Sequence, residues 1–318
     1  MQLPTLEDIR QAAVRIKPYA HRTPVLTCTS LNHLAAAHLF FKCENLQKVG
    51  AFKFRGATNA VFALTEAEAQ RGVATHSSGN HGAAVALAAR LRGVKAYIVM
   101  PKNVPAVKHA AVAAYGGTIV WCEPTQAARE ATLAQMVQET GATFIHPYND
   151  ARVIAGQGTA AFELLEDVPA LDMIVVPVGG GGLVSGTALS AAGMSPTTRV
   201  IAAEPTGADD AFRSLQSGRI VPSLNPQTIA DGLRTSLGEL TFAIIRQHVE
   251  QIVTVREEAI ISAMRDVWER MKLLIEPSAA VPVAAVLAHS VDLHGKRVGI
   301  ILSGGNVDLE NLPWSSLA

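Results

Sequence analysis

Residues 173–183, with the sequence MIVVPVGGGGL, decide the fold class of this chain. Met173 to Val178 is an uncharged apolar run of strand length, as expected for a strand buried on both faces of a parallel sheet. Four glycines then predict a turn, and Leu183 to Ala192 has the pattern of a helix. A buried strand that leads through a glycine turn into a helix is a building unit of α/β proteins.

The same alternation occupies most of the chain. Short apolar runs predict further strands at residues 39–42, 73–75, 96–100, 118–121, 200–203 and 298–302. Helical patterns follow at residues 83–91, 126–139 and 257–273, and Thr5 with Asp8 predicts a capped helix that ends near Ile16. Strands that alternate with helices predict an α/β fold with mainly parallel sheets in two lobes.

Composition limits the classes of function. The 318 residues correspond to roughly two domains at about 150 residues each. With 49% apolar and 17% charged residues, the composition is that of a folded globular protein. Because 27 Lys and Arg residues balance 27 Asp and Glu residues, no basic excess favours nucleic acid or an acidic membrane surface.

Three cysteines without a C-x-x-C pattern exclude a disulfide framework and a Cys-rich zinc site. The first ten residues lack the apolar core of a secretory signal. The uncharged stretch 173–196 is broken by Pro177 and four glycines, and each half is too short to cross a bilayer. We therefore expect a cytoplasmic enzyme with no membrane partner.

The glycine turn at residues 179–182 is the first of three strand ends with unusual chemistry. Several backbone N–H groups and the positive end of the next helix can bind a phosphate without any Lys or Arg. One alternative is a tight packing turn. Another is a dinucleotide site, since Gly180 and Gly182 partly fit G-x-G-x-x-G and Glu204 follows the next strand, although Ser185 replaces the third glycine.

The other two junctions are SSGNH at residues 77–81 and LSGGNV at residues 302–307. The first predicts a carboxylate pocket at a helix start, or simply a capped helix. The second places Ser303 at the end of a strand, where its hydroxyl would face the ligand crevice; the alternative is an ordinary strand-ending turn. Lys53 lies between Phe52 and Phe54, where loss of water would lower its pKa and make it a nucleophile or base; most lysines are instead solvated surface groups.

Four segments together resemble the serine/threonine dehydratase and serine racemase family of pyridoxal phosphate (PLP) enzymes. They are AFKFRGA (51–57), SSGNH (77–81), GGGGL (179–183) and SGGN (303–306). The resemblance covers almost the whole chain and implies the PLP fold type II. It implies a large PLP-binding domain made of residues 1–71 and 149–318, and a small domain made of residues 72–148.

The resemblance also implies roles for individual residues. Lys53 would form the Schiff base, Phe52 would pack against the cofactor ring, Asn80 would bond its hydroxyl and Ser303 its pyridine nitrogen. The phosphate would be held by Gly179, Gly180, Gly181, Gly182 and the N–H of Leu183. The substrate carboxylate would be held by Ser77 and His81.

A divalent-cation site is implied at residues 204–210, with carboxylates from Glu204 and Asp210 and the carbonyl of Ala208. Oxygen ligands suit Mg²⁺ or Ca²⁺, and Mn²⁺ would also fit. The alternative is a solvated acidic helix start. Arg129 would reach a distal substrate carboxylate in racemase-like relatives, or it is a solvated helix arginine.

The resemblance predicts a dehydratase that converts serine, threonine or 3-hydroxyaspartate to a 2-oxo acid and ammonia. The uncharged Ser303 would leave the ring a weaker electron sink than a carboxylate would, which favours elimination over transamination. Ser78 matches the hydroxyl that moves a proton in serine racemases, so serine racemase is the alternative, whereas Tyr148 departs from the racemase pattern. The segments around Lys53 and Asn306 are closer to the 3-hydroxyaspartate dehydratase branch. A homodimer without a regulatory domain is expected.

Overall fold

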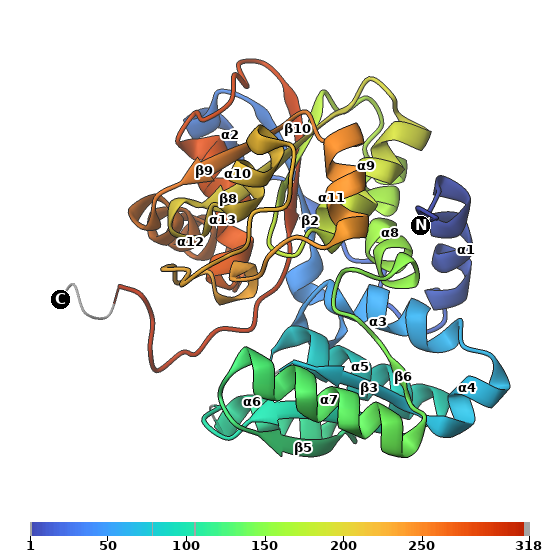
Figure 1. Ribbon diagram of the computed structural model, residues 1–318. Coiled ribbons are helices and arrows are strands. Elements are labelled where there is room, and N and C mark those ends of the chain that lie inside the picture. The colour runs from blue at the N-terminus through green and yellow to red at the C-terminus, as the bar shows by residue number, and fades with distance from the viewer. Residues whose placement is uncertain (1, 78, 105, 315–318) are drawn as a thin grey trace.

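The computed structural model describes residues 2–77, 79–104 and 106–314. Its elements form two α/β lobes, each built around one sheet (Figure 1). The predicted two-lobed α/β fold with mainly parallel sheets is therefore confirmed.

The larger lobe contains a six-stranded sheet whose two central strands carry a single charged residue, Arg297. β10 lies between β2 and β7, and every strand pair is parallel except β1 with β2. All five residues of β7 are buried, as the sequence of this strand predicts. In order across the sheet, the strands are β1 (Val25–Leu26), β2 (His38–Cys43), β10 (Arg297–Leu302), β7 (Met173–Pro177), β8 (Arg199–Pro205) and β9 (Gln251–Val255).

Helices cover both faces of this sheet, so that its apolar side chains are removed from water on each side. One face packs against α2 (Thr29–Ala35), α12 (Glu257–Met271) and α13 (Pro277–Leu287). The other face packs against α8 (Ala151–Asp167), α9 (Gly182–Met194), α10 (Asp210–Ser217) and α11 (Glu239–His248). The predicted N-terminal helix is α1 (Leu6–Ile16), with the Thr5–Asp8 capping box in place, and it packs on α8.

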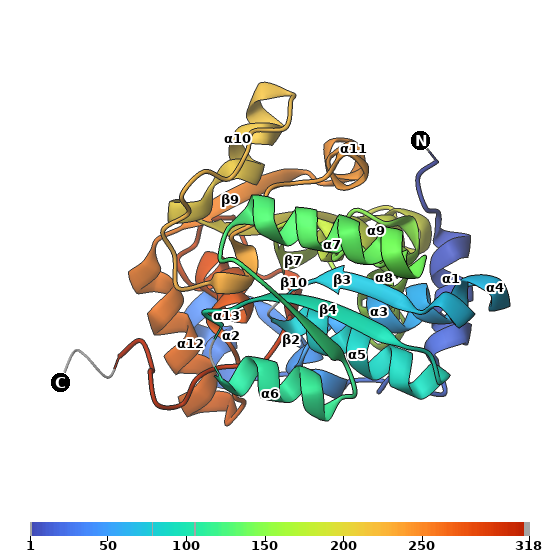
Figure 2. The same cartoon turned by 60° about the horizontal axis from the view of Figure 1, so that its bottom comes forward.

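The smaller lobe contains a four-stranded, all-parallel sheet. In order, its strands are β5 (Thr118–Cys122), β4 (Ala96–Pro101), β3 (Val73–His76) and β6 (Thr143–Phe144). Figure 2 shows α7 (Gln126–Thr140) on one face of this sheet, and α5 (Asn80–Arg92) and α6 (Ala106–Ala114) on the other. All four strands fall inside the segment predicted to form the small domain; its boundaries at residues 72 and 148 stay a prediction.

Two helices join the lobes in sequence and in space. α3 (Lys53–Phe62) and α4 (Glu66–Arg71) precede β3, and α3 packs against both α5 of the small lobe and α8 of the large lobe. Figure 1 shows α3 at the junction of the two lobes. The sequence patterns did not predict α3, α8 or α13, and their burial on several sides explains why.

Three predicted junctions lie at the carboxyl ends of parallel strands. β7 leads into the glycine turn, β3 into the SSGNH segment and β10 into Ser303. Carboxyl ends of parallel strands are where open α/β sheets bind ligands. Among the described residues, no helix is both long and apolar enough to cross a membrane.

Candidate active site

Lys53 is the first residue of α3 and lies where the two lobes meet. The preceding backbone is fixed to the end of β10, because the Phe52 N–H donates to the Ser303 carbonyl at 3.0 Å. The Lys53 Nζ donates to the Pro147 carbonyl at 2.9 Å and lies 5.0 Å from the centre of the Phe52 ring. Burial lowers the pKa of Lys53 to about 8, although the negative charge of Glu276 opposes this shift. A large fraction of the amine is therefore neutral near pH 8, as a nucleophile or base requires.

The glycine turn is wrapped closely by neighbouring side chains. A Cβ on Gly180 would lie 2.2 Å from the Tyr148 ring, and one on Gly182 would lie 2.4 Å from the Gln157 Oε1. Gly181 has a φ of +90°, a conformation that favours glycine. The Thr241 hydroxyl donates to the Gly180 carbonyl at 2.8 Å. The turn thus holds its shape while the first N–H groups of α9 remain without helical partners, as a phosphate site requires.

Lys53 and the glycine turn meet at the segment 147–148. The Gln157 Nε2 donates to the same Pro147 carbonyl as Lys53, at 3.4 Å. The Gln157 Oε1 is buried and has no hydrogen-bond partner among the described residues. Tyr148, the residue that departs from the racemase pattern, lies beside the glycine turn and packs against Gly180 and Gly182. The sequence did not predict a role for Gln157, since an uncharged amide within a helix carries no local signal.

Ser303 follows β10 and is 2% exposed. Its hydroxyl has no hydrogen-bond partner among the described residues. A buried hydroxyl without a partner costs about 1–3 kcal/mol, so such groups usually face a ligand or water. This orphan hydroxyl fits the predicted contact with a cofactor ring nitrogen.

Asn80 belongs to a polar cluster that the sequence revealed only in part. Its Nδ2 lies 3.1 Å from both carboxylate oxygens of Glu276, and its Oδ1 accepts from the Asn306 Nδ2 at 2.9 Å. The Asn306 N–H also donates to Glu276, at 3.2 Å. The predicted bond from Asn80 to the ring hydroxyl stays a prediction. Glu276 was missed, although it is the only charged residue between Lys272 and Asp292.

The predicted carboxylate pocket follows β3. Ser78 lies outside the described residues, and the Ser77 hydroxyl accepts from the Gly79 N–H at 3.3 Å. His81 is buried, with its Nε2 3.0 Å from the Ile145 carbonyl, and burial lowers its pKa to about 3. A neutral ring does not attract a carboxylate by charge, so this position would contribute mainly through the N–H groups at the start of α5. The substrate roles of Ser77 and His81 stay predictions.

Arg129 lies on α7, half-buried above the small sheet. Its Nε is buried and has no hydrogen-bond partner among the described residues. Burial chiefly lowers the pKa of nearby His76, and the charge of Arg129 adds to this effect. A row of aromatic rings leads from His76 through Phe144 and His146 to Tyr148, with successive ring centres 5.8, 5.4 and 4.6 Å apart. The predicted contact of Arg129 with a distal carboxylate stays a prediction.

The predicted cation ligands converge between β8 and α10. Glu204 accepts from the N–H groups of Ala211 at 3.0 Å and Phe212 at 2.9 Å, and burial raises its pKa to about 8. Burial raises the pKa of Asp210 to about 6, and both of its carboxylate oxygens lack a hydrogen-bond partner among the described residues. Ala208, in η3 (Thr206–Ala208), is buried beside them.

These two acids carry buried negative charge that a cation would neutralise in place of protons. The described part of the chain contains no group of three or more His, Cys, Asp or Glu side chains suited to a metal. A cation here would thus need backbone oxygen ligands such as the Ala208 carbonyl. The hydrogen bonds of Glu204 to the start of α10 leave it poorly placed for a nucleotide ribose, as the dinucleotide alternative would require.

Comparison with known proteins identifies the family. Residues 16–304 match the family described as pyridoxal-phosphate dependent enzymes. The chain belongs to this family. The predicted cofactor class is thereby confirmed, and the dinucleotide alternative for the glycine turn is overturned.

Individual relatives are similar along nearly their whole length. A β-hydroxyaspartate dehydratase from Paracoccus denitrificans (strain Pd 1222) is 52% identical over 315 residues, which cover 99% of this chain and all of the relative. A serine racemase from Arabidopsis thaliana is 53% identical over 314 residues, covering 97% of this chain and 95% of the relative. The crystal structure of a serine racemase from Dictyostelium discoideum superposes with a TM-score of 0.93 at 51% identity, covering 96% and 99% of the two chains. The predicted dehydratase and racemase kinship and the PLP fold type II are confirmed.

The polar groups of the site fit pyridoxal phosphate. The glycine turn leaves N–H groups for a phosphate, Ser303 offers an unpaired hydroxyl, and Lys53 supplies an amine of lowered pKa. These three features lie around one region, because Lys53 contacts Pro147 and follows the backbone bonded to Ser303, while the turn packs on Tyr148.

Proposed function

We propose that the protein is a PLP-dependent dehydratase that converts a β-hydroxy amino acid to a 2-oxo acid and ammonia. The substrates proposed are serine, threonine and 3-hydroxyaspartate. The observation that carries the proposal is the lowered pKa of Lys53, with its amine on the Pro147 carbonyl beside the glycine turn. The full-length similarity to a β-hydroxyaspartate dehydratase supports the choice of reaction.

In this proposal the chain's own residues make five kinds of contact with the cofactor. Lys53 holds it covalently, and Gly179 to Gly182 with the Leu183 N–H hold its phosphate. Asn80 and Ser303 bond the ring, and Phe52 packs beside it. Bound pyridoxal phosphate supplies an electron sink for the bond broken at the substrate Cα.

When the substrate amine takes its place on the cofactor, the freed Lys53 amine would act as the general base at the substrate Cα. Its pKa of about 8 suits proton transfer near neutral pH better than that of an ordinary lysine. Ser77 and the N–H groups at the start of α5 bind the α-carboxylate, and Arg129 binds the distal carboxylate of 3-hydroxyaspartate. The neutral hydroxyl of Ser303 does not hold a proton on the ring nitrogen as a carboxylate would, which favours loss of the β-hydroxyl.

We also propose Mg²⁺, or Ca²⁺ or Mn²⁺ in its place, at Glu204, Asp210 and the Ala208 carbonyl. The raised pKa values of both acids support this assignment, because a cation would compensate their buried charge. A homodimer in the cytoplasm completes the proposal. Light scattering at several protein concentrations would test the dimer, and a constant monomer mass would contradict it.

The test of the reaction is a keto acid assay with L-serine, L-threonine and 3-hydroxyaspartate, with and without EDTA. Lys53→Ala should abolish turnover while the protein still unfolds cooperatively. Lys48→Ala is the matched control, since Lys48 lies over the Phe54 ring outside the proposed contacts and should keep activity. Borohydride reduction of wild-type holoenzyme should leave the cofactor attached to Lys53. Normal turnover by Lys53→Ala would refute the proposal.

Serine racemase is the second candidate function. The 53% identity to a plant serine racemase is within one percentage point of the 52% identity to the dehydratase, so overall similarity does not separate the two reactions. Ser78 would be the residue that moves a proton on the face of the cofactor opposite Lys53. Measuring pyruvate against D-serine from L-serine decides between them, and faster racemisation than elimination would favour the racemase.

A further inference from the structure

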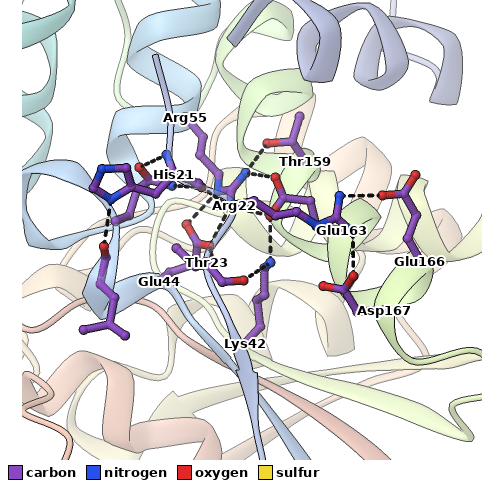
Figure 3. Close-up of polar contacts among 12 residues, drawn as sticks. His21, Arg22, Thr23, Lys42, Glu44, Arg55, Thr159, Glu163, Glu166 and Asp167 are labelled. Atoms are coloured by element: carbon purple, nitrogen blue, oxygen red, sulfur yellow. Dashed lines mark hydrogen bonds and ion pairs between the residues drawn. The ribbon is translucent and has the colours of Figure 1, made fainter. Parts of the chain in front are cut away.

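A buried ionic cluster surrounds Arg55, which follows Lys53 by two residues in the first turn of α3 (Figure 3). The Arg55 guanidinium bonds Glu44 through Nε at 2.7 Å and Nη2 at 2.9 Å, and it bonds both oxygens of Glu163 at 2.8 Å. The Thr159 hydroxyl accepts from Nη1 at 3.2 Å, and the His21 carbonyl shares the N–H groups of Nη2 at 3.2 Å. The side chains of Arg55 and Glu44 are fully buried. Arg55 therefore uses its planar fork on two carboxylates at once.

The cluster is electrically balanced. Lys42, also fully buried, donates to Glu163 at 2.7 Å and to the Thr23 carbonyl at 2.7 Å. Two cations thus face two carboxylates, and Arg55 and Lys42 hold the pKa of Glu163 below its ordinary value although burial opposes this. Such a cluster is often no more stabilising than apolar packing of equal volume, so stability alone does not account for it. The planar guanidinium of Arg55 additionally fixes the orientation of the groups that it bonds.

The side chains that bond Arg55 belong to η1 (Glu44–Leu46) and α8, two elements outside its own helix. Glu44 belongs to η1, and Thr159 and Glu163 belong to α8. The next residue, Gly56, lies so close to α8 that a Cβ there would come within 2.8 Å of the Val153 carbonyl. The first turn of α3 is therefore held on α8 by backbone contact and by the ionic fork together.

The same helix α8 also holds the phosphate end of the site. A Cβ on Gly158 would lie 2.9 Å from the Gly186 carbonyl of α9, and the Ser190 hydroxyl donates to the Gly158 carbonyl at 3.0 Å. α9 begins at Gly182, in the glycine turn. α8 thus contacts both the helix that begins with Lys53 and the helix that begins with the proposed phosphate site.

We propose that Arg55 is a positioning residue: its bonds to Glu44 and Glu163 fix the first turn of α3 on α8 and so set the Lys53 amine relative to the glycine turn. This role rests on the proposed function, in which Lys53 holds the cofactor and moves the Cα proton. Different side chains bond the far half of α3 and the residues just after it. Arg15 donates to Asn59 at 2.5 Å, and Arg92 bonds the Val61 and Leu64 carbonyls.

The test compares Arg55→Lys with Arg92→Lys in the holoenzyme. Arg55→Lys keeps a cation between the two carboxylates, so no buried charge is stranded, but it loses the fork. Arg92→Lys makes the same chemical change at the opposite end of α3 and is the matched control. For each variant we would measure kcat and KM, the visible band of the Lys53–cofactor linkage, hydrogen exchange of the peptide spanning residues 52–57, and the thermal unfolding midpoint.

We expect Arg55→Lys to lower kcat by about 10- to 100-fold with KM little changed, since misplacement by about 1 Å can cost this much. Its visible band should shift, and exchange in residues 52–57 should accelerate. Arg92→Lys should lose thermal stability only. If Arg55→Lys also changes only the unfolding midpoint, Arg55 is merely structural and the proposal is overturned.

A second variant, Glu163→Gln, keeps the shape of the partner and should change kcat and the band in the same direction. An unchanged band and kcat in Glu163→Gln, with faster unfolding, would likewise count against positioning. The same measurements distinguish failure of the proposed function from failure of the positioning role. A wild-type protein without a borohydride-sensitive band refutes the proposed function itself, whereas a wild type with that band and an unaffected Arg55→Lys variant refutes only the positioning role.

Discussion

Replacing Gly180 with Ala is expected to weaken the binding of pyridoxal phosphate through a collision with Tyr148. The added Cβ would lie 2.2 to 2.4 Å from three atoms of the Tyr148 ring, against a practical minimum of 3.0 Å, so the turn or the ring must move by about 0.8 Å. Overpacking of this kind costs about 1–3 kcal/mol. If the turn moves, that energy corresponds to roughly a 5- to 140-fold loss of cofactor affinity.

A double-mutant cycle tests whether Tyr148 causes the loss. Cofactor affinity would be measured by absorbance titration for wild type, Gly180→Ala, Tyr148→Ala and the double variant. Because Tyr148→Ala removes the colliding ring, Gly180→Ala should cost much less in that background. An equal loss in both backgrounds would refute the collision, and no loss in either would refute the assignment of this turn to the phosphate.

Three further predictions concern buried polar groups. Ser303→Ala should raise the unfolding midpoint of cofactor-free protein, because it removes an unpaired buried hydroxyl that costs about 1–3 kcal/mol, and should weaken cofactor binding; a lower midpoint would contradict this. The folded pKa values of Glu204 and Asp210 are raised, so the folded state holds extra protons and stability should fall as pH rises from about 4 toward 8. Added Mg²⁺ should therefore raise the unfolding midpoint more at pH 8 than at pH 5. Asp210→Asn should remove this difference, whereas the control Asp209→Asn should keep it. Equal Mg²⁺ effects at both pH values would argue against the site. Arg129→Gln should lower kcat/KM for 3-hydroxyaspartate by about 10- to 100-fold and spare L-serine, as loss of a charged hydrogen bond predicts, and equal losses for both substrates would exclude this role.

The sequence predicted the sheets well because their strands obey simple patterns. β7 is wholly apolar and β10 is apolar after its first residue, Arg297, and each is followed by a turn with glycine or serine. α3 escaped prediction because it packs against both α5 and α8, so it has no solvent face to create a helical period. Its buried Arg55, Thr58 and Asn59 resemble surface residues in sequence. In α8, Gly156 and Gly158 lower helix propensity, yet they are needed for close contact with α3 and α9.

The proposed cofactor contacts lie at strand or helix ends, where short motifs were visible in the sequence. Glu276 and Gln157 were not predicted, because their significance arises only from long-range contacts. Glu276 meets Asn80 across 196 residues of chain, and Gln157 meets the glycine turn through the packing of α8 on α9. Local patterns carry no information about such pairs.

The position of β10 within the large sheet has a consequence for how the protein is made. This strand is the last in chain order, yet it lies between β2 and β7 and is followed at once by Ser303. During synthesis on the ribosome, the small sheet can assemble early, since its strands are complete by Phe144. The large sheet instead stays split, with an open seam between β2 and β7, until β10 emerges. With Ser303 in its proposed contact to the cofactor ring, the cofactor site of a nascent chain is complete only after residue 303 has been translated.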